Sequence, residues 1–314
     1  MNSKSPDRRR RRPPGGYATG AVFVVVVTAL CILLVTLMLL SNKQDTGIRV
    51  WVLNHAPDQV VIINPYNGQV ASKFQVADGL KDLAFSRDFK KAYVGNVVDV
   101  TNKLTVLDTA TYNKERTIEI DGVPQGIGVF PDNDKLAVIT ASKTNFMAGG
   151  FDVLDMNERS AADPTRQKRL YRERGLELTH KIAVGDDGDR IYCLDAKEPL
   201  VHVFSFKQES WIKDIYLHGA PEEMLYPPVG DYFYISVLQH RAIYQISKAT
   251  DEIVGAFIYE LHDLEWPMRN GRLRHMAVDS RGEYLVGTNY ELKSVAIWRI
   301  GDPEFMYDLS LIHI

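Results

Sequence analysis

The sequence predicts an all-β fold, built from repeated small sheets and preceded by one N-terminal α-helix. Three observations lead to this prediction. Beyond residue 48 the chain has short alternating or β-branched runs, separated by Gly, Asp, Asn and Pro, and no sustained 3.6-residue periodicity. A similar strand recurs there at intervals of 42 to 55 residues. Before it, residues 21–40 form an uncharged run of twenty residues, which is the length of a membrane span.

Residues 17–41 are predicted to be a transmembrane helix. The competing interpretation is a cleaved signal peptide, whose apolar region is usually about 7 to 15 residues long and ends at small residues. Here the run is longer, and the polar residues 42–47 after it form a short linker. Residues 1–16 contain six basic residues. The positive-inside rule therefore places this tail in the cytoplasm and the rest of the chain outside.

This topology predicts a single-pass protein of a cytoplasmic (inner) membrane, with its main domain in the periplasm or outside the cell. Membrane lipid is the expected partner of residues 17–41. The formal net charge is −3, from 37 Lys and Arg against 40 Asp and Glu, so no nucleic-acid-binding face is expected. Only Cys31 and Cys193 occur, one in the apolar run and one in a predicted strand. They provide neither a disulfide framework nor a cysteine metal site.

The strand that recurs beyond residue 48 is apolar and ends in small or polar residues. Its six copies are residues 50–54, 92–96, 136–140, 191–195, 233–237 and 285–289. Most copies follow a strand that runs into a polar turn, and most precede a strand that ends in Asp or Ser. Repeats of about 40 to 50 residues with several strands each are typical of propeller blades. Residues 48–308 are thus predicted to form a β-propeller with about six four-stranded blades, the first beginning at its second strand.

Part of the repeat resembles a known family. The segments Tyr93-Val94-Gly95-Asn96, Leu104-Thr105-Val106-Leu107-Asp108-Thr109 and Phe130-Pro131-Asp132-Asn133 are similar to the YVTN-type, WD40-like repeats of bacterial and archaeal β-propellers. The resemblance covers residues 48–306 and is strongest from 80 to 140. It implies the propeller fold. Relatives include cell-surface proteins, lactonase-like enzymes and the haem d1 propeller of nitrite reductases, so the resemblance does not select a function.

The last six residues are unusual. Leu309-Ser310-Leu311-Ile312-His313-Ile314 is the translation of CTGTCTCTTATACACATC, the end of a transposase adapter used in preparing DNA libraries. Our hypothesis is that residues 309–314 derive from such an adapter and that the propeller is truncated. The alternative is a natural apolar tail that matches by chance. If the hypothesis holds, a closing strand and a seventh blade belong to the complete protein, because an open sheet edge is a liability.

The innermost strands of a propeller line its central channel, and residues at their start form a ring at one mouth. Aligning the predicted inner strands places the following side chains at matching positions: Lys81, Asp82, Gln125, His180, Lys181, Glu222, Glu223, Arg274 and His275. Such a ring is consistent with an anionic ligand, a metal held by His180 and His275, or an acid/base pair. The simpler interpretation, which we favour, is a solvated mouth whose charges pair with one another.

Two insertions account for the longest repeats. The first, residues 159–177, contains four arginines predicted to contact an acidic partner or a lipid surface: Arg166, Arg169, Arg172 and Arg174. The second, residues 262–274, contains Trp266 near arginine, the composition of an interface anchor. The alternatives are a solvated outer strand for the first insertion and, for the second, a loop folded over its own blade.

The sequence contains no HExxH, CxxCH, GxSxG or Walker-type motif, so no catalytic residue, metal ligand or cofactor is predicted. We expect a membrane-anchored interaction or scaffold subunit of a membrane or envelope complex, since tethering raises the local concentration of partners in the same membrane. The alternative is a propeller enzyme or cofactor carrier, lactonase-like or haem d1-like, that uses the channel mouth.

Overall fold

The computed structural model describes most of the chain beyond residue 48: residues 49–54, 59–64, 67–75, 79–98, 101–142, 148–163, 165–177, 179–195, 197–237, 242–258, 273–279, 281–289 and 294–310. The chain divides into two compact units, Met1–Val50 with Asn64–Gln69, and Trp51–Ile63 with Val70–Ile314. In the smaller unit, the described residues include a turn in which the Gly68 amide donates to the Asn64 carbonyl at 2.9 Å. The larger unit contains the sheets.

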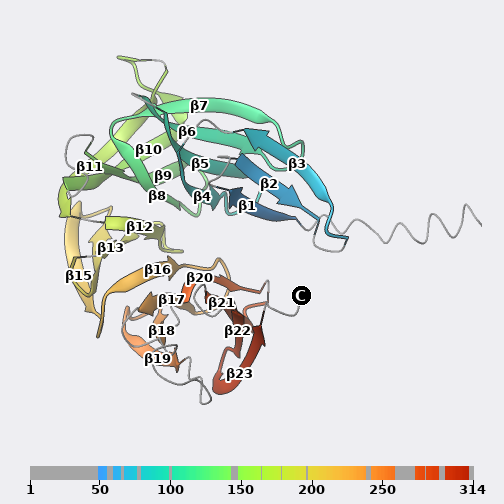
Figure 1. Ribbon diagram of the computed structural model, residues 1–314. Helices are drawn as coiled ribbons and strands as arrows, with labels where there is room; N and C mark the ends of the chain where they lie inside the picture. The colour runs from blue at the N-terminus through green and yellow to red at the C-terminus, as the bar shows by residue number, and fades with distance from the viewer. Residues whose placement is uncertain are drawn as a thin grey trace, which may run out of the picture. The chain divides into compact units, whose positions relative to one another are not determined.

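All regular elements in the described ranges are strands, in six antiparallel sheets that follow chain order (Figure 1). The first three sheets are β1 (Val50–Asn54), β2 (Gln59–Ile63) and β3 (Val70–Gln75); β4 (Leu80–Phe85), β5 (Lys91–Val98), β6 (Thr101–Asp108) and β7 (Lys114–Ile120); and β8 (Val123–Val129), β9 (Lys135–Ala141), β10 (Ala148–Arg159) and β11 (Gln167–Glu177).

The other three sheets contain four strands each. They are β12 (Thr179–Val184), β13 (Arg190–Asp195), β14 (Leu200–Ser205) and β15 (Ser210–Tyr216); β16 (Pro221–Leu225), β17 (Tyr232–Val237), β18 (Ala242–Ser247) and β19 (Ile253–Ile258); and β20 (Leu273–Val278), β21 (Tyr284–Asn289), β22 (Ser294–Arg299) and β23 (Asp302–Ser310).

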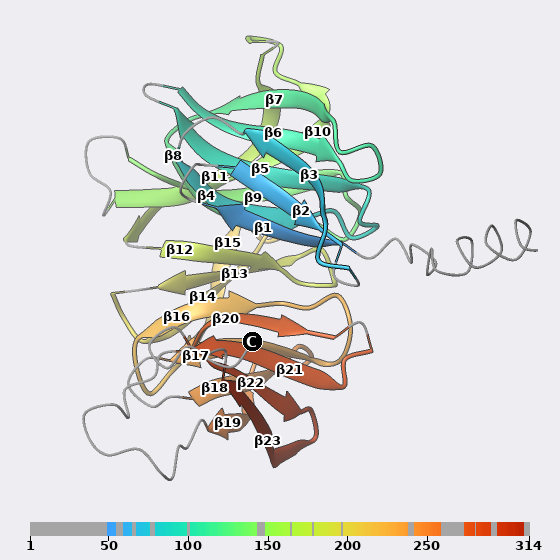
Figure 2. The same ribbon diagram turned by 45° about the vertical axis from the view of Figure 1, so that its right-hand side comes forward.

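The larger unit is a six-bladed β-propeller, as the repeats predict. The first strands of the four-stranded sheets lie against one another in the order β4, β8, β12, β16, β20 and form the centre (Figure 2). Each recurring strand of the sequence is the second strand of its blade, because β5, β9, β13, β17 and β21 each pair with the central strand. The first sheet has three described strands and starts at the equivalent of a second strand, as predicted.

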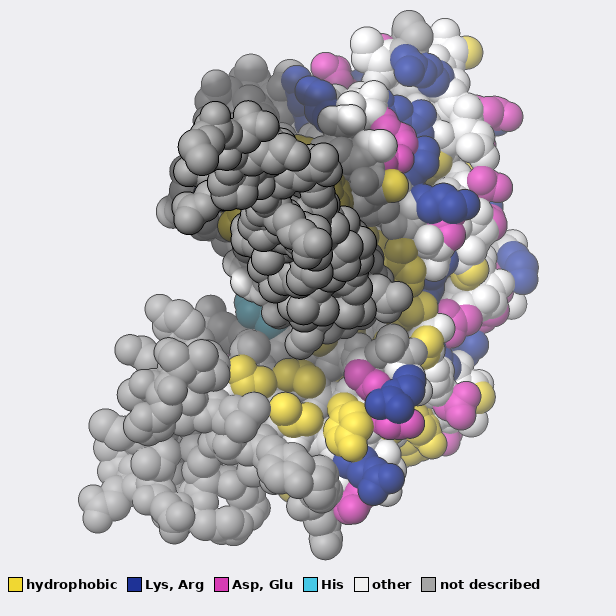
Figure 3. Space-filling model, turned by 90° about the vertical axis from the view of Figure 1, so that its right-hand side faces the viewer, with side chains coloured by type: hydrophobic (Ala, Val, Ile, Leu, Met, Phe, Trp, Pro, Cys, Tyr) yellow, Lys and Arg dark blue, Asp and Glu magenta, His cyan; other side chains and the backbone are white. Residues whose placement is uncertain are grey.

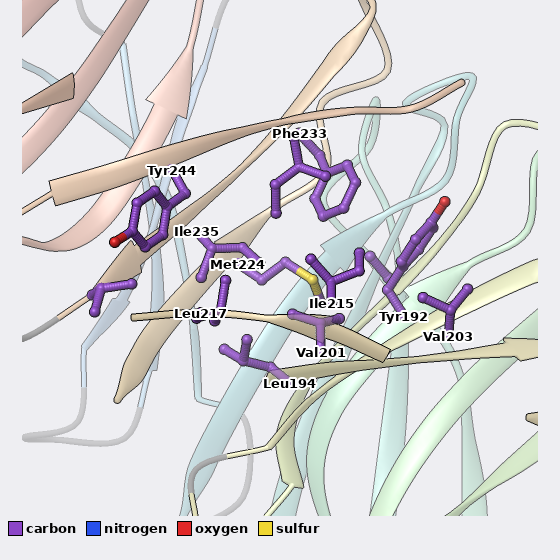
Figure 4. Close-up of a cluster of buried hydrophobic side chains, with 13 residues drawn as sticks. Tyr192, Leu194, Val201, Val203, Ile215, Leu217, Met224, Phe233, Ile235 and Tyr244 are labelled. Atoms are coloured by element: carbon purple, nitrogen blue, oxygen red, sulfur yellow. The ribbon is translucent and has the colours of Figure 1, made fainter. Parts of the chain in front are cut away.

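Five buried clusters join the successive blades and form the core. Between blades four and five, for example, Tyr192, Leu194 and Val201 pack against Phe233 and Ile235 (Figure 4). Fully burying one such aliphatic side chain contributes about 1.5–3 kcal/mol to stability. The equivalent clusters join blades one to two, two to three, three to four and five to six.

The recurring strands are continuously apolar because both of their faces are buried. In β9, Leu136 and Val138 pack against blade two, whereas Ala137 and Ile139 pack against blade four. Successive strand residues point to opposite faces of a sheet. Blades two to five each have a neighbouring blade on both faces. This two-sided burial explains why the sequence repeats show apolar runs rather than strict alternation.

Several sequence predictions lie outside the described residues. They include the tail 1–16, the span 17–41, the linker 42–47 and the final residues 311–314. Within the described ranges no helix is long and apolar enough to cross a membrane. Leu309 lies in β23 opposite Val295 of β22, and the adapter origin of residues 309–314 stays a prediction.

Candidate functional site

The same irregularity occurs in all five described central strands at the positions that the sequence predicts to form a ring at the channel mouth. In each strand the pairing with its neighbour skips one residue: Lys81, Gln125, His180, Glu222 and Arg274. The residue after each bulge is Asp82, Gly126, Lys181, Glu223 or His275. A β-bulge re-aims the side chains next to it. The ten positions are therefore equivalent in the five strands.

Four residues of the ring form a chain of charged contacts across the mouth. The Lys181 Nζ lies 3.1 Å from Glu223 Oε1 and 3.4 Å from Asp82 Oδ1. The other carboxylate oxygen of Glu223 lies 3.5 Å from His275 Nδ1. Asp82 also accepts a 2.9 Å hydrogen bond from the Ile127 amide of β8. Side chains from four strands therefore compensate one another's charge.

Gly126 explains how Asp82 and Lys181 meet although β8 lies between their strands. A Cβ atom at Gly126 would stand 3.0 Å from the His180 carbonyl oxygen and 3.4 Å from Lys181 Cα. Such distances are too short for an ordinary side chain, so β12 packs at this distance only against a glycine.

Burial and charge act in opposite directions on the ionisable groups of the mouth. Burial of Lys181 by itself would lower its pKa, but the carboxylates of Asp82 and Glu223 outweigh this effect and raise the pKa above its usual range. Burial of Glu223 would raise its pKa, but His275 and Lys181 together lower it. Both groups are therefore held in their charged forms at neutral pH.

The structure places the remaining predicted mouth residues as follows. Lys81 is exposed and Gln125 is half-buried. The His180 Nε2 lies 3.0 Å from the Glu222 carbonyl oxygen, which ties β12 to β16. Among the described residues no group of three or more His, Cys, Asp and Glu side chains has the arrangement of a metal site. Arg274 lies in β20, and its side chain is outside the described set.

A cavity of about 340 Å³ follows the central strands away from the mouth. Asp82, Lys181 and Glu223 line one end, and Arg87 and Phe89 line the other. The wall between them is largely apolar and includes Leu83, Ala84, Ile127, Ala183 and Met224. The far end was not predicted from the sequence. A signal was present, since Phe89 occupies a turn position at which the four blades that follow have Asn or Gly.

Three of the four predicted docking arginines converge on one carboxylate. Asp121 lies 2.7 Å from Arg172 and 3.0 Å from Arg169, and it also pairs with Arg166. The Arg172 contact is the main cause that lowers the pKa of Asp121 far below its usual range. By contrast, the Arg174 side chain is exposed, and among the described residues its guanidinium contacts Thr140 Oγ1 at 3.5 Å. The predicted anchor Trp266 lies outside the described residues.

A second surface, which the sequence analysis missed, lies on the outer strands. Each outer strand of the first five blades has a bulge opposite its neighbour. The bulged residues are Ala71, Glu115, Leu170, Ile212 and Val254. The last three belong to consecutive blades and have exposed fractions of 37%, 44% and 55%. We call Leu170, Ile212 and Val254 the rim stripe.

Other large apolar side chains are exposed beside the rim stripe. Trp211 and Tyr216 of β15 are exposed by 39% and 70%, and Ile258 of β19 is exposed by 52%. Trp and Tyr are the residues most enriched in interface hot spots. On the face in Figure 3, acidic, basic and hydrophobic side chains are interspersed over the described part. The outer strands of blades three, four and five thus form the candidate interaction surface.

Comparison with known proteins shows the fold. No protein-family model matches the chain, and no curated protein sequence matches it. Among solved structures, the chain is similar to the Cps50 (Swd1) β-propeller domain of Myceliophteria thermophila, with a TM-score of 0.64 and 14% sequence identity. The match covers 85% of this chain and 83% of that domain. The neighbour is a WD40 propeller, and at this identity the likeness concerns the fold alone.

Proposed function

We propose that this protein is an interaction scaffold, a propeller whose outer rim binds another protein. The rim stripe carries the proposal. Exposed aliphatic side chains occupy the same bulge on three consecutive blades, where the first two blades have Ala71 and Glu115. Unprotected outer strands with large apolar side chains promote aggregation unless they are covered. A partner that packs an apolar segment along these strands would cover them.

The partner is proposed to lie in or on the same membrane. The uncharged run at 21–40 and the basic residues before it support a single-pass anchor with the propeller outside the cytoplasm. In this view the chain is a membrane-anchored member of the YVTN-type propellers and part of a membrane or envelope complex. Tethering both proteins to one membrane raises their effective concentration, so a modest apolar contact is sufficient.

The arrangement of arginines refines the predicted contact surface. Asp121 pairs with all three of Arg166, Arg169 and Arg172, and Asp163 and Asp152 pair in addition with Arg166 and Arg172, which favours a structural role for these arginines. Arg174 is the arginine of this segment best placed to meet an acidic group of the partner. The alternative function, catalysis or cofactor binding at the channel mouth, has less support because Lys181 and the two carboxylates beside it are occupied with one another.

The test is co-purification of the full-length chain from its native membrane in mild neutral detergent. Replacing the rim stripe by serine (Leu170→Ser, Ile212→Ser and Val254→Ser) is expected to remove an integral membrane partner that is present in stoichiometric amount with the wild type. Ala71→Ser changes the equivalent exposed bulge of blade one and serves as the matched control. Unchanged circular dichroism and thermal unfolding establish that the triple variant is folded.

Two results would contradict the proposal. One is a triple variant that retains the partner as fully as the Ala71→Ser control does. The other is a wild-type chain that purifies alone with a bound metal or an absorbing cofactor, which would favour the channel-mouth alternative. The absorption spectrum and metal content of the same sample distinguish these cases.

A further inference from the structure

The far end of the central cavity brings a cation and two aromatic rings together. Arg87 and Phe89 belong to the turn between β4 and β5, and Tyr226 follows β16. All three line the 340 Å³ cavity. The Arg87 Cζ lies 5.8 Å from the centre of the Tyr226 ring, within cation–π range.

Two basic side chains beside the Tyr226 ring, Arg87 and Lys248, share the carboxylate of Asp186. Asp186 lies close to both Lys248 and Arg87, but its contact with the Lys248 Nζ is the shorter one, 2.8 Å against 3.4 Å. Lys248 also donates to the Pro227 carbonyl at 2.7 Å and lies 4.6 Å from the centre of the Tyr226 ring. The Asp186 carboxylate thus pairs with two cations, and its contact with Lys248 is closer than its contact with Arg87.

The Arg87 guanidinium therefore keeps donors for another acceptor. It has five N–H groups, and in the described part of the chain it makes one hydrogen bond, from Nη2 to the Val184 carbonyl at 2.9 Å. This bond, together with a backbone bond from the Arg87 amide to Asn133 Oδ1, fixes the side chain at the cavity wall. A fixed guanidinium with spare donors is the usual protein group for binding a carboxylate.

Phe89 adds an exposed aromatic ring at a strained position. Its φ is +56°, a left-handed conformation that L residues other than Asn and Asp rarely adopt. The corresponding turn residues of the four blades that follow are Asn133, Gly188, Gly230 and Gly282, all with φ between +61° and +77°. The Phe89 side chain is 59% exposed, so burial compensates little of the strain. Strain of this kind accompanies functional sites.

We propose that this end of the cavity binds a small organic acid with an apolar or aromatic body. Its carboxylate would accept hydrogen bonds from Arg87 in the positive field of Lys248. Its apolar body would contact Phe89 and the apolar wall of the cavity. A volume of about 340 Å³ lies within the range of small-molecule sites, which is about 300 to 1,000 Å³. This site is separate from the rim stripe, and the proposal does not depend on the scaffold role.

The test uses 3-phenylpropanoate and its neutral amide as probes of the full-length chain in neutral detergent, with binding measured by calorimetry. The carboxylate is expected to bind at least about tenfold more tightly than the amide, because a charge-assisted hydrogen bond contributes that much. Arg87→Gln is expected to remove this preference. Arg281→Gln, an exposed arginine in the equivalent turn of blade six, is the charge-matched control and should bind like the wild type.

Phe89→Asn supplies a second measurement with two readouts. Asparagine is the residue that the next blade has at this position, Asn133, and it tolerates a positive φ. The thermal midpoint is therefore expected to rise, while the loss of the aromatic ring lowers the affinity for the carboxylate about threefold to tenfold. If Phe89 had only a structural role, its replacement would not weaken binding. The proposal is overturned if 3-phenylpropanoate does not bind at about 10 mM, if Arg87→Gln binds it as the wild type does, or if Phe89→Asn leaves the affinity unchanged.

Discussion

Lys181 lies between two carboxylates at the channel mouth, and Lys181→Met removes the charge and keeps most of the side-chain volume. At 3.1 and 3.4 Å from Glu223 and Asp82, each pair has a gross attraction of about 5 kcal/mol at an effective dielectric constant of about 20. Removing one partner of a buried pair costs about 3–5 kcal/mol. The three side chains retain 14% to 27% exposure, so we expect a loss of about 2–3 kcal/mol in the free energy of unfolding.

The same substitution has a signature in the pH dependence of stability. The pKa of Glu223 is lowered in the folded protein. A carboxylate of this kind contributes stability that is complete above its unfolded pKa, about 4.3, and is lost as the pH falls through the folded pKa. Lys181→Met removes one cause of the lowered pKa. The stability difference between wild type and variant should therefore narrow as the pH falls below about 4.3.

Urea unfolding of the full-length chain in neutral detergent, followed by circular dichroism at pH 7 and at pH 3.5 to 4.5, measures both effects. Lys168→Met is the control, because the Lys168–Glu158 pair lies at 2.7 Å on the exposed surface and should leave the midpoint unchanged. A Lys181→Met variant as stable as Lys168→Met at pH 7 would contradict the predicted ion pairing, and so would a stability difference between Lys181→Met and wild type that grows on acidification.

Three further substitutions test the packing of the propeller by the same unfolding assay. Tyr192→Phe removes a 2.7 Å hydrogen bond from the buried Tyr192 hydroxyl to Asp251 Oδ1 and should cost about 1–2 kcal/mol, whereas no loss would show that the bond contributes nothing. Gly126→Ala should cost about 1–3 kcal/mol, because the added Cβ clashes with the backbone of β12. Gly255→Ala is the control and should cost less, because its Cβ meets the flexible end of Gln245 at 3.3 Å. Equal losses from the two variants would contradict this account. Asn133→Ala places an alanine at φ +61° and removes the Oδ1 acceptor of the Arg87 amide. We expect a loss of about 1–2 kcal/mol in the free energy of unfolding, and an unchanged stability would contradict this role of Asn133.

The repeat made most of the fold predictable from sequence. Strands such as 136–140 and 191–195 are buried on both faces, so their apolar runs recur wherever a blade recurs. The equivalence of these positions was predictable for the same reason, since a bulge at one place in each of the five described central strands keeps Asp82, Lys181 and Glu223 in register. A repeated backbone feature leaves a repeated spacing in the sequence.

Pairing between residues far apart in the chain was not predictable. The sequence analysis interpreted Arg166, Arg169 and Arg172 as a basic docking surface, because nothing near them indicates that Asp121 comes close. The rim stripe also escaped notice, since Leu170, Ile212 and Val254 look like ordinary strand residues until the blade pairing shows that each lies at a bulge. Surface exposure depends on tertiary packing, which local patterns do not encode.

Site-specific photocrosslinking of the full-length chain in its native membrane tests directly whether the rim stripe binds a partner protein. A photoreactive residue in place of Ile212 lies in the middle of the rim stripe, and one in place of Glu115 lies at the equivalent bulge of blade two. The scaffold account predicts one dominant adduct, with an integral membrane protein, from the Ile212 position and none from the Glu115 position. The same adducts from both positions, or none from Ile212, would contradict it.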